Sequence, residues 1–242
     1  MMKILSIGNS FSTDAQRYLY ELAKQDGVTL KTVNLYIGGC SLRMHYLNML
    51  DDQAAYAFEF NSVDTNLKVS IRQALESDDW DVVTLQQASR LSGEEKTYFP
   101  YIEALAEYVR KYCPHAKIFI HQTWAYEDGS DWLHSLGYQT ATEMFEKVQA
   151  CYAKAAQTIK AHGVIPCGEA MITAFQNGLT NLHRDTYHAS YGVGRYLLAL
   201  TWYKTLTGKE VGNNAFDALD EAINDSDRKI VIESVEKSLS KK

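Results

Sequence analysis

The chain has very little proline, 3 residues in 242, and no Gly- or Ser-rich stretch or shift in composition divides it. The absence of a linker predicts one domain over residues 1–242, with one large hydrophobic core. Apolar runs are short as well, and the longest candidate, Tyr196–Tyr203, is followed by Lys204. A membrane-spanning helix needs roughly 18 to 20 apolar residues, so we expect no integral membrane protein and no membrane partner.

Cysteine is scarce and scattered. The chain contains no Cys-x-x-Cys pair and no Cys/His cluster at zinc-ligand spacing; its four cysteines are Cys40, Cys113, Cys151 and Cys167. Disulfide frameworks and structural zinc sites need paired spacings. The sequence therefore predicts free or buried thiols and no metal site.

Basic residues are in the minority, with 24 Lys and Arg against 30 Asp and Glu and a formal net charge of -6. Because there is no basic stripe, a nucleic-acid partner is not expected. The N-terminus reads Met-Met-Lys and lacks the apolar region and small-residue cleavage site of a secretory signal. The sequence as given predicts a cytoplasmic protein, although an exported protein without its leader would read the same. The oligomeric state stays open.

The chain does contain a regular alternation of short β-rich runs and longer segments of helical periodicity. The β-rich runs are Lys3–Ile7, Leu30–Tyr36, Asp81–Leu85, Lys117–His121 and Val164–Cys167. Helices are predicted at Thr13–Gln25, Asn66–Ser77, Pro100–Tyr112, Tyr138–Ala161, Tyr191–Thr207 and Phe216–Ser238. This alternation predicts an α/β fold with a parallel sheet covered on both faces. Ligands of such sheets bind at the carboxyl ends of the strands.

A serine follows the first predicted strand, in the segment Gly8-Asn9-Ser10-Phe11-Ser12. A hydroxyl in this place stands at the edge of the sheet, where backbone N–H groups can face a developing oxyanion. Ser10 is therefore a candidate nucleophile. The plainer alternative is that Ser10 or Ser12 only caps the following helix.

The sequence Asp185-x-x-His188 follows the fifth predicted strand. A neutral His188 can take the proton of a serine hydroxyl, while Asp185 fixes the tautomer and stabilises the imidazolium. The alternative is a helix-capping aspartate with an incidental histidine. Their pairing with Ser10 favours catalysis, because both segments lie at the same edge of the predicted sheet.

Together these segments resemble the sequence blocks of the SGNH (GDSL-like) hydrolase superfamily. Gly8-Asn9-Ser10 is similar to the first block, usually Gly-Asp-Ser, while Gly38-Gly39-Cys40-Ser41 resembles the second and Asp185-x-x-His188 matches the fifth. The resemblance spans nearly the whole chain. It implies a three-layer α/β/α, flavodoxin-like fold with a five-stranded parallel sheet in the order 2-1-3-4-5. It also implies ester hydrolysis with Ser10, His188 and Asp185 as catalytic residues.

The family resemblance further implies an oxyanion hole containing the N–H groups of Ser10 and Gly39. The third block departs from the family, because Leu85-Gln86-Gln87-Ala88-Ser89 stands where Gly-x-Asn is expected. A glutamine amide can donate the same hydrogen bond from one methylene further out. We therefore predict Gln87, or failing it Gln86, as the third donor.

Four residues near strand ends are candidates for substrate binding: Asn9, Gln122, Trp124 and Tyr126. The last three follow the fourth predicted strand. The two aromatic side chains either stack on a sugar ring or pack under a loop.

The sequence thus predicts a serine esterase that needs no cofactor and hydrolyses a small acyl ester by acyl transfer. Its 16 Tyr and 4 Trp residues, without a long apolar flap, favour O-acetyl groups on a carbohydrate as substrate. One alternative is a catalytically weak or silent carbohydrate-binding protein, because the third block is altered. Another is a phosphate or nucleotide binder on a flavodoxin-like fold, although the usual glycine-rich phosphate motifs are missing.

Overall fold

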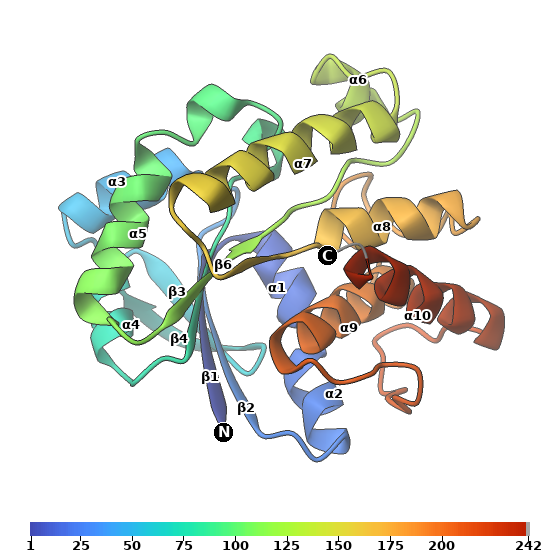
Figure 1. The fold of residues 1–242 in the computed structure, drawn as a ribbon, viewed down its shortest axis with the longest axis horizontal. Coiled ribbons are helices and arrows are strands. Elements are labelled where there is room, and N and C mark those ends of the chain that lie inside the picture. The colour runs from blue at the N-terminus through green and yellow to red at the C-terminus, as the bar shows by residue number, and fades with distance from the viewer. Residues whose placement is uncertain (241–242) are drawn as a thin grey trace.

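Residues 1–240, which the computed structural model describes, form a seven-stranded sheet between two layers of helices (Figure 1). The strands are β1 (Met2–Gly8), β2 (Leu30–Tyr36), β3 (Tyr56–Phe60), β4 (Val63–Val69), β5 (Val82–Leu85), β6 (Lys117–His121) and β7 (Gly163–Ile165). Their order is β4-β3-β2-β1-β5-β6-β7. Strands β2, β1, β5, β6 and β7 pair in parallel, whereas β3 is antiparallel to β2 and β4.

The predicted α/β class with a largely parallel sheet is confirmed, but the prediction of five strands in the order 2-1-3-4-5 is wrong. A hairpin of β3 and β4 extends the sheet beyond β2. Its two turn residues, Asn61 and Ser62, have φ values of 46° and 66°, as a tight two-residue hairpin turn requires. Strand β4 lies at the edge and is mostly exposed, so it lacks the apolar run that marks the buried strands. The helix predicted from Asn66 therefore begins only after Ser70, whose side chain caps it.

The helices form two layers on opposite faces of the sheet. They are α1 (Ser10–Gln16), α2 (Leu19–Gln25), α3 (Leu42–Leu50), α4 (Ile71–Glu76), α5 (Tyr101–Tyr112), α6 (Asp131–Ser135), α7 (Ala141–Thr158), α8 (Cys167–Gln176), α9 (Val193–Thr207) and α10 (Asp225–Leu239), with short 3-10 helices η1 (Ser89–Leu91) and η2 (Glu95–Thr97). Helices α1, α2 and α9 pack together on one side, with α8 and α10 against α9; α3, α4, α5 and α7 lie on the other (Figure 1). The helices that connect the parallel strands thus cover both faces of the sheet.

Several element ends differ from the sequence prediction. The helix predicted over Thr13–Gln25 is two helices, α1 and α2. The C-terminal helix predicted from Phe216 begins at Asp225, because the side chain of Asn224 accepts a hydrogen bond from the Asp227 N–H and caps it there.

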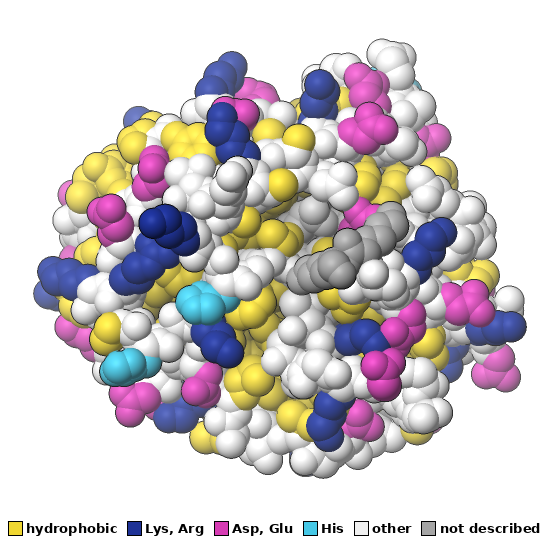
Figure 2. Space-filling model, viewed as in Figure 1, with side chains coloured by type: hydrophobic (Ala, Val, Ile, Leu, Met, Phe, Trp, Pro, Cys, Tyr) yellow, Lys and Arg dark blue, Asp and Glu magenta, His cyan; other side chains and the backbone are white. Residues whose placement is uncertain are grey.

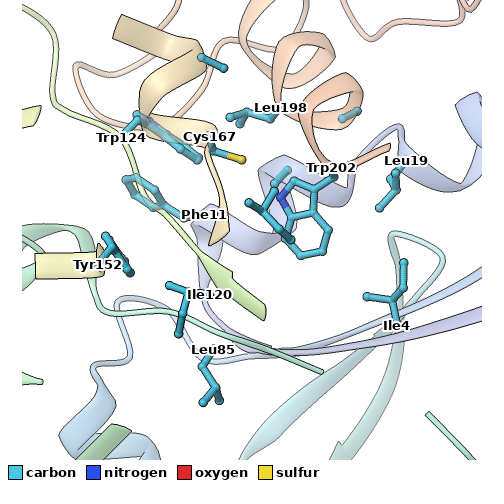
Figure 3. Packing of buried hydrophobic residues seen from close by; sticks show 14 of the residues in the cluster. Ile4, Phe11, Leu19, Leu85, Ile120, Trp124, Tyr152, Cys167, Leu198 and Trp202 are labelled. Atoms are coloured by element: carbon cyan, nitrogen blue, oxygen red, sulfur yellow. The ribbon is translucent and has the colours of Figure 1, made fainter. Parts of the chain in front are cut away.

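The core contains apolar side chains from the central strands and from α9. Ile4, Leu85 and Ile120 come from β1, β5 and β6, and Leu198 and Trp202 from α9 (Figure 3). All four cysteines are free and buried, as predicted. On the face shown in Figure 2, Lys and Arg side chains are interspersed with Asp and Glu rather than gathered in one patch. None of the helices within residues 1–240 combines the length and the apolar character needed to cross a membrane.

Candidate active site

The turn between β1 and α1 places Ser10 at the carboxyl edge of the sheet. Asn9, not Ser10, is the N-cap of α1: its Oδ1 accepts from the Phe11 N–H at 3.0 Å, and Ser12 Oγ accepts from the Asn9 N–H at 3.0 Å. This reciprocal capping box fixes the turn. The hydroxyl of Ser10 is therefore not needed to begin the helix.

Ser10, His188 and Asp185 lie in one hydrogen-bonded chain. His188 Nε2 is 2.8 Å from Ser10 Oγ, and His188 Nδ1 is 2.8 Å from Asp185 Oδ2. Asp185 Oδ1 also accepts from the backbone N–H of His188 at 2.8 Å. The carboxylate thus orients the ring and requires hydrogen on Nδ1, which leaves Nε2 as an acceptor for the serine proton.

Asp185 stays ionised although it is partly covered. Burial alone would raise the pKa of its carboxyl, but the hydrogen bonds from His188 and the charge of Arg184 hold this pKa below its ordinary value. The carboxylate can therefore stabilise a protonated His188.

The loop that bears Asp185 and His188 is fixed by contacts with the segment after β6. The Glu127 N–H donates to Thr186 O at 2.7 Å, and Trp124 Nε1 donates to Tyr187 O at 2.8 Å. Trp124 is fully buried and stacks on Phe11 with ring centroids 4.1 Å apart (Figure 3). Its prediction as a substrate-binding residue is wrong, because the indole packs beneath the loop.

The loop after β2 places Gly39 in the lining of the pocket that contains Ser10. Gly39 has a φ of +60°, a backbone conformation that residues other than glycine rarely adopt. Within residues 1–240, neither the Gly39 N–H nor the Ser10 N–H donates to a protein acceptor, and both residues line the same pocket. These two N–H groups are free to bind a substrate oxygen.

Gln87 does not reach this pocket, and its prediction as the third donor is wrong. Its Nε2 donates to Thr97 O at 2.9 Å and Thr97 Oγ1 at 3.0 Å, which uses both amide hydrogens. Its Oε1 accepts from the N–H groups of Leu42 and Ala88. The side chain is fully buried. It joins the loop after β5 to the start of α3 and to η2.

Gln86 points towards the nucleophile turn but is held by its neighbours. Its Nε2 donates to Asn9 Oδ1 at 2.7 Å, and its Oε1 lies 2.7 Å from His121 Nδ1. Burial lowers the pKa of His121 to about 3, so the ring is neutral. Because Gln86 Oε1 can only accept, Nδ1–H is the donor. Asn9 Nδ2 in turn donates to Cys40 O at 3.1 Å. Gln86 thus contacts Asn9, which in turn contacts the Gly39 loop, and it does not line the pocket above Ser10.

The two glutamines should respond differently to truncation. In Gln87→Ala the Leu42 and Ala88 N–H groups lose their acceptor, so we expect a loss of about 2 to 4 kcal/mol in unfolding free energy with kcat within about threefold. In Gln86→Ala we expect a drop in kcat of about tenfold, because Asn9 loses its anchor. Melting temperature and kcat for p-nitrophenyl acetate, measured together, check this. A large loss of kcat in Gln87→Ala at unchanged melting temperature would contradict it.

Of the remaining predicted substrate residues, Tyr126 and Asn9 line the pocket and Gln122 does not. Gln122 is buried, and its Oε1 accepts from the Glu169 N–H at the start of α8 at 3.0 Å. Its prediction as a substrate-binding residue is wrong, because its amide oxygen serves the backbone. Tyr126 Oη lies 3.0 Å from Ser89 Oγ.

The pocket above Ser10 has a volume of about 340 Å³. It is lined by Asn9, Ser10, Phe11, Tyr36, Gly38, Gly39, Ala88, Ser89, Arg90, Tyr126, Trp132, Tyr187 and His188. Sequence reasoning missed Tyr36, Arg90 and Tyr187. Arg90 directly follows the altered third block and Tyr187 lies inside the Asp-x-x-His sequence, so proximity to the motifs is the signal that could have found them.

Nearly the whole chain is similar to one protein family and to several solved structures. A family model described as "Domain of unknown function (DUF4886)" matches residues 3–234. A solved DUF4886 family protein from Bacteroides uniformis is 31% identical, with a TM-score of 0.91 over 99% of this chain and 95% of that chain. A comparison with curated proteins finds no match.

More distant solved structures share the fold. A putative GDSL-like lipase from Parabacteroides merdae is 15% identical, with a TM-score of 0.57 over 86% of this chain and 95% of that chain. A carbohydrate esterase family 3 protein from Talaromyces cellulolyticus is 13% identical, with a TM-score of 0.56 over 86% and 97%. The chain therefore has a GDSL-like α/β fold, and at these identities the likeness extends to the fold alone.

Proposed function

The chain belongs to the DUF4886 family, and from its site we propose that it is a serine esterase that removes small acyl groups, most of all O-acetyl groups, from a carbohydrate. The observation that carries this proposal is the hydrogen-bonded chain from Asp185 through His188 to Ser10, beside two free backbone N–H groups. An oriented base in contact with a hydroxyl is the arrangement that activates a serine nucleophile.

Each step of ester hydrolysis has a residue in reach. Ser10 Oγ attacks the ester carbonyl carbon as His188 Nε2 takes its proton, and the N–H groups of Ser10 and Gly39 bind the oxyanion. The imidazolium, stabilised by Asp185, then protonates the leaving alcohol oxygen as the C–O bond breaks, leaving acyl-Ser10. Water attacks this ester, giving a proton to His188, which returns it to Ser10 Oγ as the acid leaves.

The aromatic side chains around the pocket support a carbohydrate as the alcohol part of the substrate ester. Trp132 is 58% exposed, and the Tyr187 ring lies 6.2 Å from it and 5.4 Å from the Tyr126 ring. Flat apolar faces with polar edges suit the faces of a sugar ring. Carbohydrate esterases among the structures of the same fold agree with this substrate class.

The test is release of p-nitrophenolate from p-nitrophenyl acetate, and of acetate from acetylated sugars, by the wild type and by Ser10→Ala. Ser10-dependent turnover supports the esterase. Sugar binding without such turnover would instead identify the silent carbohydrate-binding protein, which the lack of a side-chain oxyanion donor from Gln87 favours.

The pH profile should have a single ionisation on its acid side. Because the pKa of Asp185 is held below its ordinary value, this carboxylate stays charged until the pH falls below that lowered pKa. Only His188 then has to lose a proton before it can act as base, so log kcat/KM should rise with a slope of one. Asp185→Asn should lower the rate and keep this slope. A slope of two in the wild type would contradict the assignment.

A further inference from the structure

Arg90 is an exposed cation in the pocket wall, and no carboxylate of residues 1–240 pairs with it. Four of the other arginines are ion-paired with carboxylates, namely Arg17, Arg72, Arg184 and Arg195. Arg90 differs from the remaining unpaired ones in that it lines the pocket above Ser10. No salt bridge within residues 1–240 includes Arg90, whose guanidinium has one long contact, from Nη1 to Gly39 O at 3.4 Å. Most of its five N–H groups therefore remain available to a ligand.

Arg90 lies beside Gly39, one of the two proposed oxyanion donors, and lines the same pocket as Ser10. Its Nη1 is also 3.4 Å from the position that a Cβ on Gly39 would occupy, so the guanidinium lies against the loop that supplies the oxyanion donor. The pocket is lined on other sides by the aromatic rings of Tyr126, Trp132 and Tyr187. A substrate that stacks on these rings with its ester at Ser10 lies in the same pocket as Arg90.

We propose that the alcohol part of the substrate carries a carboxylate, so that the enzyme deacetylates an acidic sugar of the uronic acid type. This rests on the proposed function, because it names the substrate of the same site. A planar guanidinium matches a carboxylate with two parallel hydrogen bonds. The acetyl group has no charge, so the carboxylate must belong to the sugar.

A phosphate group fits this pocket less well. Among the described residues that line it, Arg90 is the only lysine or arginine. A phosphate monoester carries close to two negative charges near pH 7 and gains from more than one cation, whereas a carboxylate carries one. The single guanidinium therefore favours a carboxylate.

The decisive experiment compares two acetylated methyl glycosides that differ only at C6, one of glucuronic acid and one of glucose. For the wild type, kcat/KM should be about 10- to 100-fold higher on the glucuronate, through a lower KM. Arg90→Gln should bring this ratio close to one, and Arg90→Lys should keep part of it. High salt should raise KM for the glucuronate more than for the glucose derivative.

Arg43 offers a matched control. It is exposed on α3, close in sequence to Gly39, and does not line the pocket. Arg43→Gln removes the same charge from the protein, so the glucuronate-to-glucose ratio should stay as in the wild type. This separates a local contact from a change in net charge.

Three results would overturn the proposal. The wild type would show no preference for the glucuronate, Arg90→Gln would lower kcat/KM on both substrates equally, or an acetylated sugar phosphate would be preferred. The second result would mean that Arg90 only holds the Gly39 loop. Failure of the esterase itself is distinguishable, because Ser10-dependent hydrolysis of uncharged p-nitrophenyl acetate would then be absent, and both proposals would fall.

Discussion

Ser10→Ala should lower kcat for p-nitrophenyl acetate by about 1,000-fold or more, because no other hydroxyl of residues 1–240 is hydrogen-bonded to His188. The residual rate would come from the two backbone donors and from binding alone. The melting temperature should stay within about 1 °C, since Asn9 caps α1 and Ser10 Oγ has no hydrogen-bond partner other than His188 in the described part of the chain. Steady-state kinetics and thermal unfolding on the same preparations check both expectations.

Ser12 provides the control, because it is a serine of the same turn with a different role. Its buried hydroxyl donates to Asn34 Oδ1 at 2.7 Å and accepts from the Asn9 N–H. Ser12→Ala should therefore cost about 1 to 3 kcal/mol of stability and lower the kcat of the folded protein far less than Ser10→Ala does, since the nucleophile stays. If Ser10→Ala kept a tenth of the wild-type kcat, Ser10 would not be the nucleophile.

The positions of Ser10 and His188 could be predicted because parallel strands end at one edge of a sheet. A serine after the first strand and a histidine after the fifth are 178 positions apart, yet the strand pattern alone brings them to the same edge. The prediction needed the order of strands only near β1, where the sheet agrees with it. The edge hairpin that changed the strand count lies beyond β2, away from Ser10.

The partners of polar side chains could not be predicted from the sequence. Strand alternation places Gln86 and Gln87 on opposite sides. It does not indicate which side faces Ser10 or which acceptors bind the two amide groups. Gln86 faces the nucleophile turn and meets Asn9, while Gln87 meets Thr97. These acceptors come from distant loops, so only the folded chain defines them.

The same limit applies to Trp124, whose position after β6 suggested a place at the pocket. Its N–H donates to Tyr187 O from below the loop, and the exposed aromatic face comes from Trp132 instead. Both residues follow the same strand, so distance along the sequence did not distinguish a supporting ring from an exposed one. Trp124 is buried where it stacks on Phe11, a contact that depends on the folded chain.

A buried carboxylate connects the helix of Ser10 to the loop of His188. Asp14 lies one helical turn after Ser10, and its side chain is 1% exposed. It accepts from Arg184 Nη1 at 2.9 Å and from Arg195 Nε at 2.9 Å. Arg184 directly precedes Asp185, while Arg195 belongs to α9 and also pairs with Asp220 at 2.8 Å. Asp14 therefore connects α1, which begins at Ser10, to the loop of His188 through Arg184 and to α9 through Arg195.

Asp14→Asn should lower the unfolding free energy by about 3 to 5 kcal/mol, because it leaves two partly buried guanidinium groups without their shared carboxylate. For a chain of this length the melting temperature should fall by about 10 °C. At temperatures where the variant stays folded, kcat should fall by a larger factor than KM rises, because the loop holding His188 loses its alignment with Ser10. Asp52→Asn is the control: its salt bridge with Arg72 is exposed, so it should cost less than about 1 kcal/mol. Equal melting temperatures for the two variants would show that Asp14 does not anchor the site.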